Sequence, residues 1–191
     1  MSEKYERMVL QNQAEILGFV NLLVREKVRS YLEIGSKFGG SLWQVGQQLP
    51  KGSRLVSIDL PHGDKSFKEA LPHLKACVER LRGMKREAHL HLGDSTAPEA
   101  IAFAEALGPF DCVFIDANHT EPYVREDWKN YGPMGRMVAF HDIGWIEPPG
   151  FSPHKLKIDV PKVWAELKAA HRHTEFKFQH GHNGIGVLWR S

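Results

Sequence analysis

Acids and histidines, two residue types that can do chemistry, follow the apolar segments of this chain. The segment CVFIDANHT, residues 112–120, begins apolar and then presents Asp116, Asn118 and His119 within four residues. A carboxylate can bind a cation or accept a hydrogen bond, and an imidazole can take up a proton near neutral pH. The other apolar segments end in a similar way, at Glu33 and Gly35, at Asp59, at Gly93 and Asp94, and at His141 and Asp142.

The apolar patterns around these residues predict strands that alternate with helices. The predicted strands cover residues 29–35, 53–60, 87–94, 110–117 and 135–143, followed by a terminal pair at 174–179 and 184–190. The predicted helices cover residues 3–28, 39–49, 65–83, 97–108, 121–131 and 160–172. This alternation predicts an α/β fold with a doubly wound sheet of about seven strands, mostly parallel, with an antiparallel C-terminal strand and helices on both faces. We expect residues 1–191 to form a single domain, in which 1–28 is an N-terminal helical segment.

The predicted sheet brings the polar residues to one edge. In a doubly wound sheet, ligands bind outside the carboxyl ends of the strands, near the point where the strand order reverses. A single acid in such a place is commonly a turn or a helix cap. Five strands that all end in polar residues predict a shared ligand site.

The first loop, EIGSKFGGS at residues 33–41, limits the ligand. A dinucleotide fingerprint has glycine at the third position of G-x-G-x-x-G, and this chain has Lys37 there. The Glu33 carboxylate would repel a pyrophosphate but suits a ligand with an ammonium group. Asp59 is placed to accept both hydroxyls of a ribose, and Asp94 to accept from an exocyclic amine such as that of adenine. An amino-acid head, a ribose and an adenine together describe S-adenosylmethionine.

The composition excludes several functional classes. The net charge of +2 is too small to indicate nucleic acid or a membrane surface as partner. Two cysteines give neither a disulfide framework nor a zinc pattern. The first residues lack the apolar core of a signal peptide, and no apolar run approaches the ~20 residues that a membrane span needs. We therefore expect a soluble, cytoplasmic protein.

Six motifs in order, YLEIGSKFGGS, SIDL, LGDS, FIDANHT, FHDI and GIGVLW, resemble those of class I S-adenosylmethionine-dependent methyltransferases. From about Tyr31 onward the chain is most similar to small O-methyltransferases related to the catechol, macrocin and mycinamicin enzymes and to cephalosporin-hydroxylase-type proteins. The resemblance implies a Rossmann-like methyltransferase sheet and O-methylation of a small-molecule or sugar hydroxyl. It also implies the cofactor-binding residues Glu33, Gly35, Ser36, Gly39, Gly40, Ser41, Asp59, Asp94, Ser95 and Asp116.

The same resemblance implies the catalytic residues. Metal-dependent members have an acid after the fourth strand and an acidic pair after the fifth, so Asp116, His141 and Asp142 are candidate ligands for a divalent cation, Mg²⁺ or Mn²⁺. His141 departs from this pattern, because an acid is usual there and imidazole suits Mn²⁺ better than Mg²⁺. His119 matches the general base of the macrolide-sugar branch, with helix capping as its alternative role.

Two other functions stay open at this point. A nicotinamide-dependent oxidoreductase would use the same kind of sheet, although Lys37 argues against it. An S-adenosylmethionine-binding module without transfer activity would explain the departure at His141. The sequence does not specify the hydroxyl acceptor, and the helix predicted at residues 3–28 could pair two copies of the chain as a homodimer.

Overall fold

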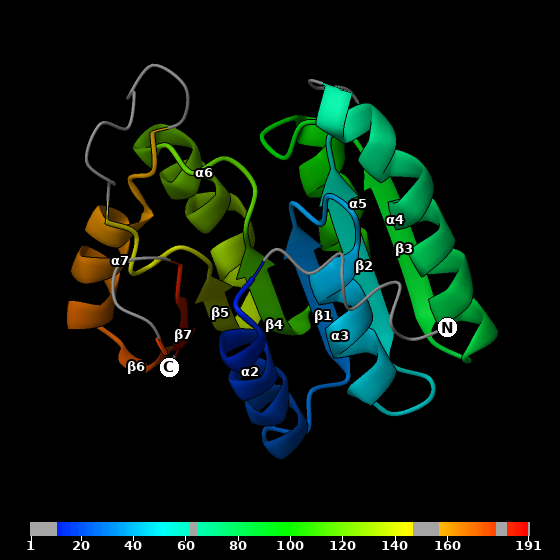
Figure 1. Cartoon of the computed structure of the whole chain (residues 1–191), viewed down its shortest axis with the longest axis horizontal. Helices are drawn as coiled ribbons and strands as arrows, with labels where there is room; N and C mark the ends of the chain where they lie inside the picture. Colours follow the sequence, from blue (N-terminus) through cyan, green and yellow to red (C-terminus); the bar gives the residue numbers. More distant parts are fainter. Residues whose placement is uncertain (1–10, 62–64, 147–156, 179–182, 191) are drawn as a thin grey trace.

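Seven strands form one sheet in the order β3-β2-β1-β4-β5-β7-β6 in the computed structural model (Figure 1). The structure describes residues 11–61, 65–146, 157–178 and 183–190, with the backbone alone at 65–68. The strands are β1 (Ser30–Ile34), β2 (Arg54–Asp59), β3 (Glu87–Leu92), β4 (Phe110–Ile115), β5 (Gly135–Phe140), β6 (Arg172–Phe176) and β7 (Ile185–Trp189). The helices are α2 (Gln13–Arg25), α3 (Gly40–Gln48), α4 (Lys65–Gly83), α5 (Pro98–Leu107), α6 (Glu121–Tyr131), η1 (Gly132–Met134) and α7 (Val160–Ala169).

The strand directions confirm the predicted fold class. All the pairs formed between strands β1 to β5 are parallel. Strand β7 is antiparallel to both β5 and β6. The sheet therefore has one reversed strand, and it is the last one in the chain. The carboxyl ends of β1 to β5 meet at the upper edge in Figure 1.

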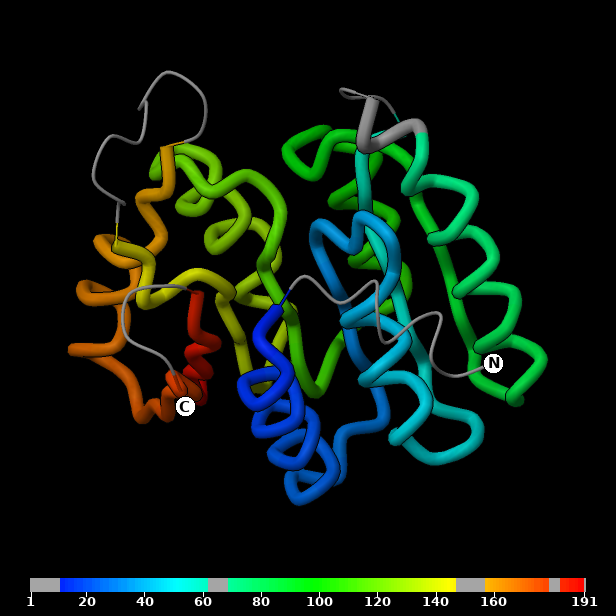
Figure 2. The backbone as a smooth tube through the Cα atoms, viewed as in Figure 1, coloured from blue at the N-terminus to red at the C-terminus, as the bar shows by residue number. Residues whose placement is uncertain are grey.

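Helices cover both faces of the sheet and enclose two apolar clusters. Helices α2, α3 and α4 pack on one face, where Phe19, Trp43 and Leu74 lie in the same cluster as the inward side chains of β1 and β4. Their coils lie in front of the sheet in Figure 2. Helices α5, α6 and α7 pack on the other face, where Val124 and Trp164 belong to the second cluster.

The N-terminal helix differs from the prediction of residues 3–28. It begins at Gln13, because Asn12 adopts a non-helical conformation and its side chain accepts a hydrogen bond from Ala14 N at 2.9 Å. It ends at Arg25, and residue Lys27 then has a φ of 56°. The prediction of one helix is therefore wrong at residues 11–12, which are not helical, and at its end, which is Arg25; its predicted start at residue 3 lies outside the described residues. No helix in the described parts of the chain is long and apolar enough to cross a bilayer.

The strand order reverses at β1, whose neighbours are β2 on one side and β4 on the other. The ends of β1 and β4 touch there through the backbone. Gly35 has a φ of +89°, and a Cβ atom at this position would lie 2.3 Å from the carbonyl oxygen of Asp116. Only glycine allows this approach. The contact joins the loop after β1 to the loop after β4, where the predicted site lies.

Candidate functional site

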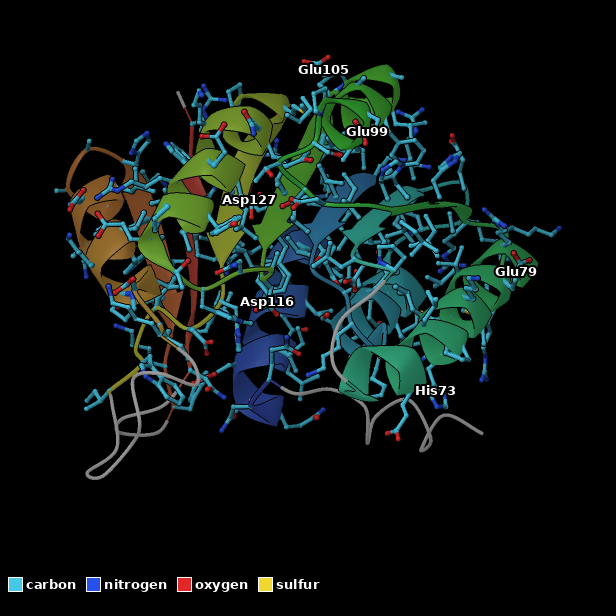
Figure 3. All side chains as sticks on the ribbon, turned by 90° about the horizontal axis from the view of Figure 1, so that it is seen from above. His73, Glu79, Glu99, Glu105, Asp116 and Asp127 are labelled. Carbon is cyan, nitrogen blue, oxygen red and sulfur yellow. The ribbon has the colours of Figure 1, made fainter. Side chains whose placement is uncertain are left out.

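The candidate site lies along the carboxyl ends of β1 to β5. Figure 3 looks onto this edge of the sheet, with Asp116 near the middle of the view and Asp127, on α6, above it in the picture. The predicted residues divide between two parts of the edge. We call the ends of β1, β2 and β3 with their loops the glycine-loop half, and the ends of β4 and β5 with theirs the histidine half.

Glu33 lies at the base of the glycine-loop half and is completely buried. Its Oε2 accepts a hydrogen bond from the Tyr31 hydroxyl at 2.7 Å, and its Oε1 accepts one from Ser41 Oγ at 2.8 Å. Burial outweighs these hydrogen bonds and raises the pKa of Glu33 to about 7. Both carboxylate oxygens thus accept hydrogen bonds from neutral hydroxyl groups. Neither of these two donors, Tyr31 and Ser41, carries a positive charge.

The loop between Glu33 and Ser41 turns tightly into α3. Gly39 precedes the helix with a φ of +79°. Cys77 leaves little room for a side chain there, since a Cβ atom added at Gly39 would lie 3.0 Å from the Cβ atom of Cys77. Ser36 Oγ shares a hydrogen bond of 2.8 Å with Ser57 Oγ on β2. The first backbone N–H groups of α3 point toward this loop, where a helix favours negative charge. The loop can therefore receive a carboxylate.

Asp59 ties the glycine-rich loop to the end of β2. Its Oδ2 accepts a hydrogen bond from the backbone N–H of Lys37, and its Oδ1 accepts one from Leu60 N at 2.7 Å. Burial raises its pKa, with the backbone hydrogen bonds acting in the opposite direction. Each carboxylate oxygen retains a lone pair, so Asp59 can still accept from a pair of ligand hydroxyls.

Asp94 is exposed and stabilises its own turn. Its Oδ1 accepts hydrogen bonds from Thr96 N at 2.9 Å and from Thr96 Oγ1 at 2.8 Å. Ser95 is fixed through its carbonyl oxygen, which accepts from the Tyr131 hydroxyl of α6 at 2.5 Å. The turn leaves Asp94 Oδ2 for a ligand, at the far end of the edge from the histidines.

The histidine half brings four of the predicted side chains into contact. His141 Nδ1 lies 3.1 Å from Asp116 Oδ1 and 3.3 Å from Asp142 Oδ1. His119 Nδ1 lies 3.2 Å from Asp142 Oδ2. Asp116 Oδ2 accepts a hydrogen bond of 2.7 Å from Gln11 Nε2, which comes from the segment before α2. Each of the four carboxylate oxygens therefore faces a side-chain nitrogen.

The electrostatics of His141 follow from these contacts. Burial disfavours its charged form, but the carboxylates of Asp116, then Asp142 and Glu15, outweigh burial and raise the pKa of His141 to about 9. Burial also disfavours the charged form of Asp142 and so raises its pKa. The neighbouring His141 and His119 offset part of this rise. Asp142 also has a φ of 58°, a left-handed conformation that aspartate tolerates better than most residues. This conformation lets the carboxylate face both histidines.

The two ring nitrogens of His119 have different surroundings. Its side chain is 21% exposed, and Asp142 holds Nδ1, which leaves Nε2 on the other side of the ring. Helix capping, its alternative role, is fulfilled by other residues: Asp159 Oδ2 accepts from Glu121 N at 3.0 Å in the first turn of α6. Asn118 Oδ1 accepts from Thr120 N at 3.0 Å, so Asn118 forms the turn before that helix.

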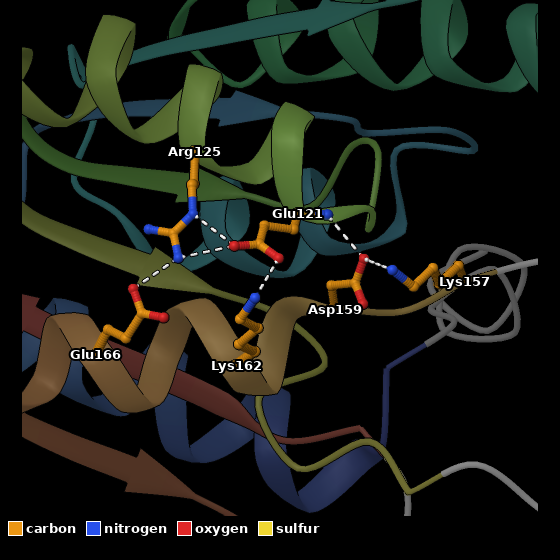
Figure 4. Close-up of polar contacts among 6 residues, drawn as sticks. All are labelled: Glu121, Arg125, Lys157, Asp159, Lys162 and Glu166. Atoms are coloured by element: carbon orange, nitrogen blue, oxygen red, sulfur yellow. Dashed lines mark hydrogen bonds and ion pairs between the residues drawn. The ribbon is translucent and has the colours of Figure 1, made fainter.

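Ion pairs join α6, which follows the loop of His119, to α7 (Figure 4). The backbone N–H of Asp159 donates to the carbonyl oxygen of His119 at 2.8 Å. Beside this contact, Glu121 pairs with Arg125 at 2.9 Å and with Lys162 at 2.6 Å, and Arg125 pairs with Glu166 at 2.6 Å. The side chain of Asp159 thus fixes the start of α6 while its backbone fixes the neighbouring His119.

Three residues of this region carry roles that the sequence did not indicate. Tyr31 and Glu33 are two apart on one strand, so they share a face, and this spacing could have suggested their hydrogen bond. Gln11 carried no signal, because its partner Asp116 is 105 residues away. Asp127 is completely buried, and its carboxylate oxygens have no hydrogen-bond partner among the described residues. Burial raises its pKa to about 7, although Ser95 acts in the opposite direction.

The fit of a divalent cation can be tested on the three candidate ligands. Within the described residues, no group of three or more His, Cys, Asp or Glu side chains is arranged to hold a metal ion. His141 Nδ1 lies within ion-pair distance of both carboxylates, so an imidazole nitrogen already occupies the space between them. A nitrogen that carries a proton cannot ligate a metal. As arranged, the three side chains bind each other and do not fit a cation.

Comparison with known proteins gives one family. The family model that matches the chain is described as a methyltransferase domain, and the match covers residues 32–143, more than half of the chain. The matched range begins in β1 and ends just after Asp142, so it contains both halves of the candidate site. Among curated protein sequences, none is similar enough to this chain to be matched.

Solved structures share the fold at low sequence identity. An O-methyltransferase from Bacillus cereus in complex with SAH has a TM-score of 0.67 and 19% identity, over 94% of this chain and 82% of that one. The O-methyltransferase TomG from Streptomyces achromogenes, involved in tomaymycin synthesis and in complex with SAM, has a TM-score of 0.68 and 20% identity, over 96% and 82%. A putative caffeoyl-CoA O-methyltransferase from Staphylococcus aureus has a TM-score of 0.64 and 15% identity, over 94% and 85%.

Proposed function

Since the chain belongs to the methyltransferase-domain family, we propose that it transfers a methyl group from S-adenosylmethionine to a hydroxyl of a small molecule or sugar. The observation that carries the hydroxyl acceptor is the pair of His119 and Asp142, with Nδ1 and Oδ2 3.2 Å apart. An imidazole oriented by a carboxylate is suited to remove a proton from a hydroxyl. Two of the structural neighbours described above are O-methyltransferases bound to SAH or SAM, which supports the same cofactor and acceptor.

The glycine-loop half is the proposed cofactor site. Glu33, Gly35, Ser36, Gly39, Gly40 and Ser41 would hold the methionine portion, Asp59 the ribose hydroxyls, and Asp94 with Ser95 the adenine. The cofactor supplies an electrophilic methyl group. Glu33 would accept from the ammonium group while Tyr31 and Ser41 keep its carboxylate in place. Asp116 would face the cofactor from the neighbouring strand end, where its carbonyl oxygen already meets Gly35.

The histidine half is the proposed acceptor site. His119 Nε2 would take the proton of the acceptor hydroxyl. The bound cofactor would supply the methyl group to the hydroxyl oxygen, with cleavage of its methyl–sulfur bond, and would leave as S-adenosylhomocysteine. Asp142 holds Nδ1–H of the same ring, so it stabilises the imidazolium that results. Asp116 acts through His141 and not on the substrate directly. Positioning of the two reactants accounts for most of the remaining rate enhancement, because the displacement is in line.

The test begins with cofactor binding. Calorimetric titration of the full chain with S-adenosylhomocysteine should show saturable binding at one site, and NAD should show none. Asp59→Ala should abolish the binding, whereas Asp111→Ala, at the opposite edge of the sheet, should preserve it. Saturable binding of NAD and not of S-adenosylhomocysteine would contradict the proposal and favour a nicotinamide-dependent oxidoreductase.

The second step is transfer. Labelled S-adenosylmethionine is incubated with a panel of catechols, sugars and natural-product hydroxyls, and label in the product is counted. Transfer that requires His119 supports the proposal. Cofactor binding without transfer to any hydroxyl of the panel, in the presence or absence of Mg²⁺ and Mn²⁺, would instead support a binding module that has lost transfer activity.

A further inference from the structure

In the histidine half, five side chains form a chain of close nitrogen–oxygen contacts, three of them ion-pair contacts and one a hydrogen bond. It runs from His119 to Asp142, then to His141, to Asp116 and finally to Gln11, with nitrogen-to-oxygen distances of 3.2, 3.3, 3.1 and 2.7 Å. Three of the five side chains are almost completely buried, with exposed fractions of 7% for His141, 9% for Asp116 and 8% for Asp142. Water therefore has little access to the centre of the chain.

His141 Nδ1 is the central nitrogen of this chain. It lies between Asp116 Oδ1 and Asp142 Oδ1, so a proton on it would serve two carboxylates that would otherwise repel each other. A divalent cation between the same two carboxylates would perform the same task. It would have to displace His141, and the buried ring packs edge-on against Phe114 at 6.5 Å between ring centroids. The position is thus filled by a side chain of the protein.

Two flanking side chains contact the other oxygen of each carboxylate. Gln11 Nε2 faces Asp116 Oδ2, and His119 Nδ1 faces Asp142 Oδ2. A cation that approached from the open side would therefore have to break the contact of the proposed general base or that of Gln11. His141 Nε2 is buried and has no hydrogen-bond partner among the described residues, so it offers no outlet to the substrate side.

We propose that the Nδ1–H group of His141 bridges Asp116 and Asp142 in place of a divalent cation, and that this bridge positions Asp142 to orient His119, so that the site works without a metal. The inference rests on the proposed function only in the role it gives to His119. In these terms His141 and Asp142 are positioning residues, because they act on the substrate through His119.

Manganese binding tests the bridge without any assay of transfer. The full chain is titrated with MnCl₂, and free Mn²⁺ is followed by electron paramagnetic resonance, with and without S-adenosylhomocysteine. We expect no saturable binding to the native chain. His141→Asp removes the bridging N–H and adds a third carboxylate, so we expect saturable binding at one site, at least about tenfold tighter than any binding by the native chain. His89→Asp on β3 is the matched control and should behave as the native chain does.

A second variant guards against failure to fold. His141→Asn retains an N–H donor, and we expect it to bind no Mn²⁺ and to keep more of the native turnover than His141→Asp does without metal. Circular dichroism and thermal melting report whether each variant is folded. Turnover of the native enzyme should not change after treatment with EDTA or addition of Mn²⁺.

Several results would overturn the inference. Saturable Mn²⁺ binding by the native chain that Asp142→Asn abolishes would show that the carboxylates hold a metal. Loss of native turnover in EDTA, with recovery in Mn²⁺, would show the same. A folded His141→Asp variant that binds no Mn²⁺ would show that His141 does not occupy a cation position. Failure of the proposed function is distinguishable, because it appears as absence of S-adenosylhomocysteine binding in a separate titration and leaves the Mn²⁺ result unaffected.

Discussion

The two halves of the candidate site both bury carboxylates but satisfy them differently. In the glycine-loop half, Glu33 and Asp59 accept from hydroxyls and backbone N–H groups, which are neutral. In the histidine half, Asp116 and Asp142 face imidazole nitrogens that can carry charge. An acid with neutral donors can still receive a cationic ligand, whereas an acid already paired with imidazole is suited to hold a base in place. This difference supports the proposal that the glycine-loop half binds the charged cofactor and that the histidine half handles the proton.

The largest expected effect is on turnover, from His119→Ala. Loss of a general base lowers the rate by about 10²–10⁴-fold. Steady-state kinetics with an accepting hydroxyl gives this factor, and calorimetry should give an unchanged affinity for S-adenosylhomocysteine. His173→Ala, on the exposed part of β6, is the control. Equal losses of turnover and of cofactor affinity would break the division between the two halves.

The next effect is on stability, from Glu33→Gln. The pKa of Glu33 is about 7 in the folded protein, above its ordinary value, so the folded state retains a proton that the unfolded state loses as the pH rises. Stability from this group is therefore present at low pH and falls by about 3 kcal/mol up to pH ~7, then stays constant. Urea unfolding at several pH values should show that the variant lacks this fall and is the more stable protein at pH ~8.

The control for that experiment is Glu87→Gln, at an exposed carboxylate on β3. Asp127 also has a raised pKa of about 7, so part of the pH dependence should persist in Glu33→Gln and become smaller when Asp127→Asn is added. A variant whose stability depends on pH as steeply as that of the native protein would show that Glu33 is ionised in the fold at low cost.

Asp59→Asn should weaken cofactor binding and leave chemistry intact. Hydrogen bonds to charged groups contribute about 1.5–3 kcal/mol, which corresponds to a loss of roughly 10–100-fold in affinity. Calorimetry with S-adenosylhomocysteine measures the loss, and turnover at saturating cofactor should be close to native. A fall in saturated turnover as large as that of His119→Ala would place Asp59 in the chemical step and blur the comparison.

The smallest expected effect comes from Arg125→Met in the ion-pair network of α6 and α7. Its contacts with Glu121 and Glu166 are exposed, and exposed ion pairs contribute little. We expect the Tm of the variant to be slightly below that of the native protein at low salt and equal to it at high salt, where exposed charges are screened. Turnover should not change. A clear loss of turnover would show that the network, and not Asp159 alone, positions the loop of His119.

The sequence predicted the sheet well because its cues are local. Apolar segments that end in polar residues specified five parallel strands, and the structure brings Asp116, His119, His141 and Asp142 together as the shared edge requires. The roles of these residues stay predictions. The N-terminal helix was predicted too long, because the cap at Asn12 did not stand out from the apolar spacing around it.

Other features depend on contacts that no local pattern encodes. The bond from Gln11 to Asp116 joins residues 105 apart, and the bonds from the backbone of residues 178 and 184 to buried Glu15 span even more of the chain. Asp127 is an acid on the polar-rich helix α6, yet it is completely buried. Whether a helical residue faces water depends on packing against distant elements, here the turn that contains Ser95.

The reversed strand has a consequence for synthesis of the protein. Strand β7 lies between β5 and β6, so β5, which leads directly to His141 and Asp142, has only one hydrogen-bonded neighbour until residues 185–189 have been made. During translation the histidine half must therefore wait with an open strand edge, while the glycine-loop half already has all its strands. The edge of β5 is therefore completed only when the last strand of the chain has been made.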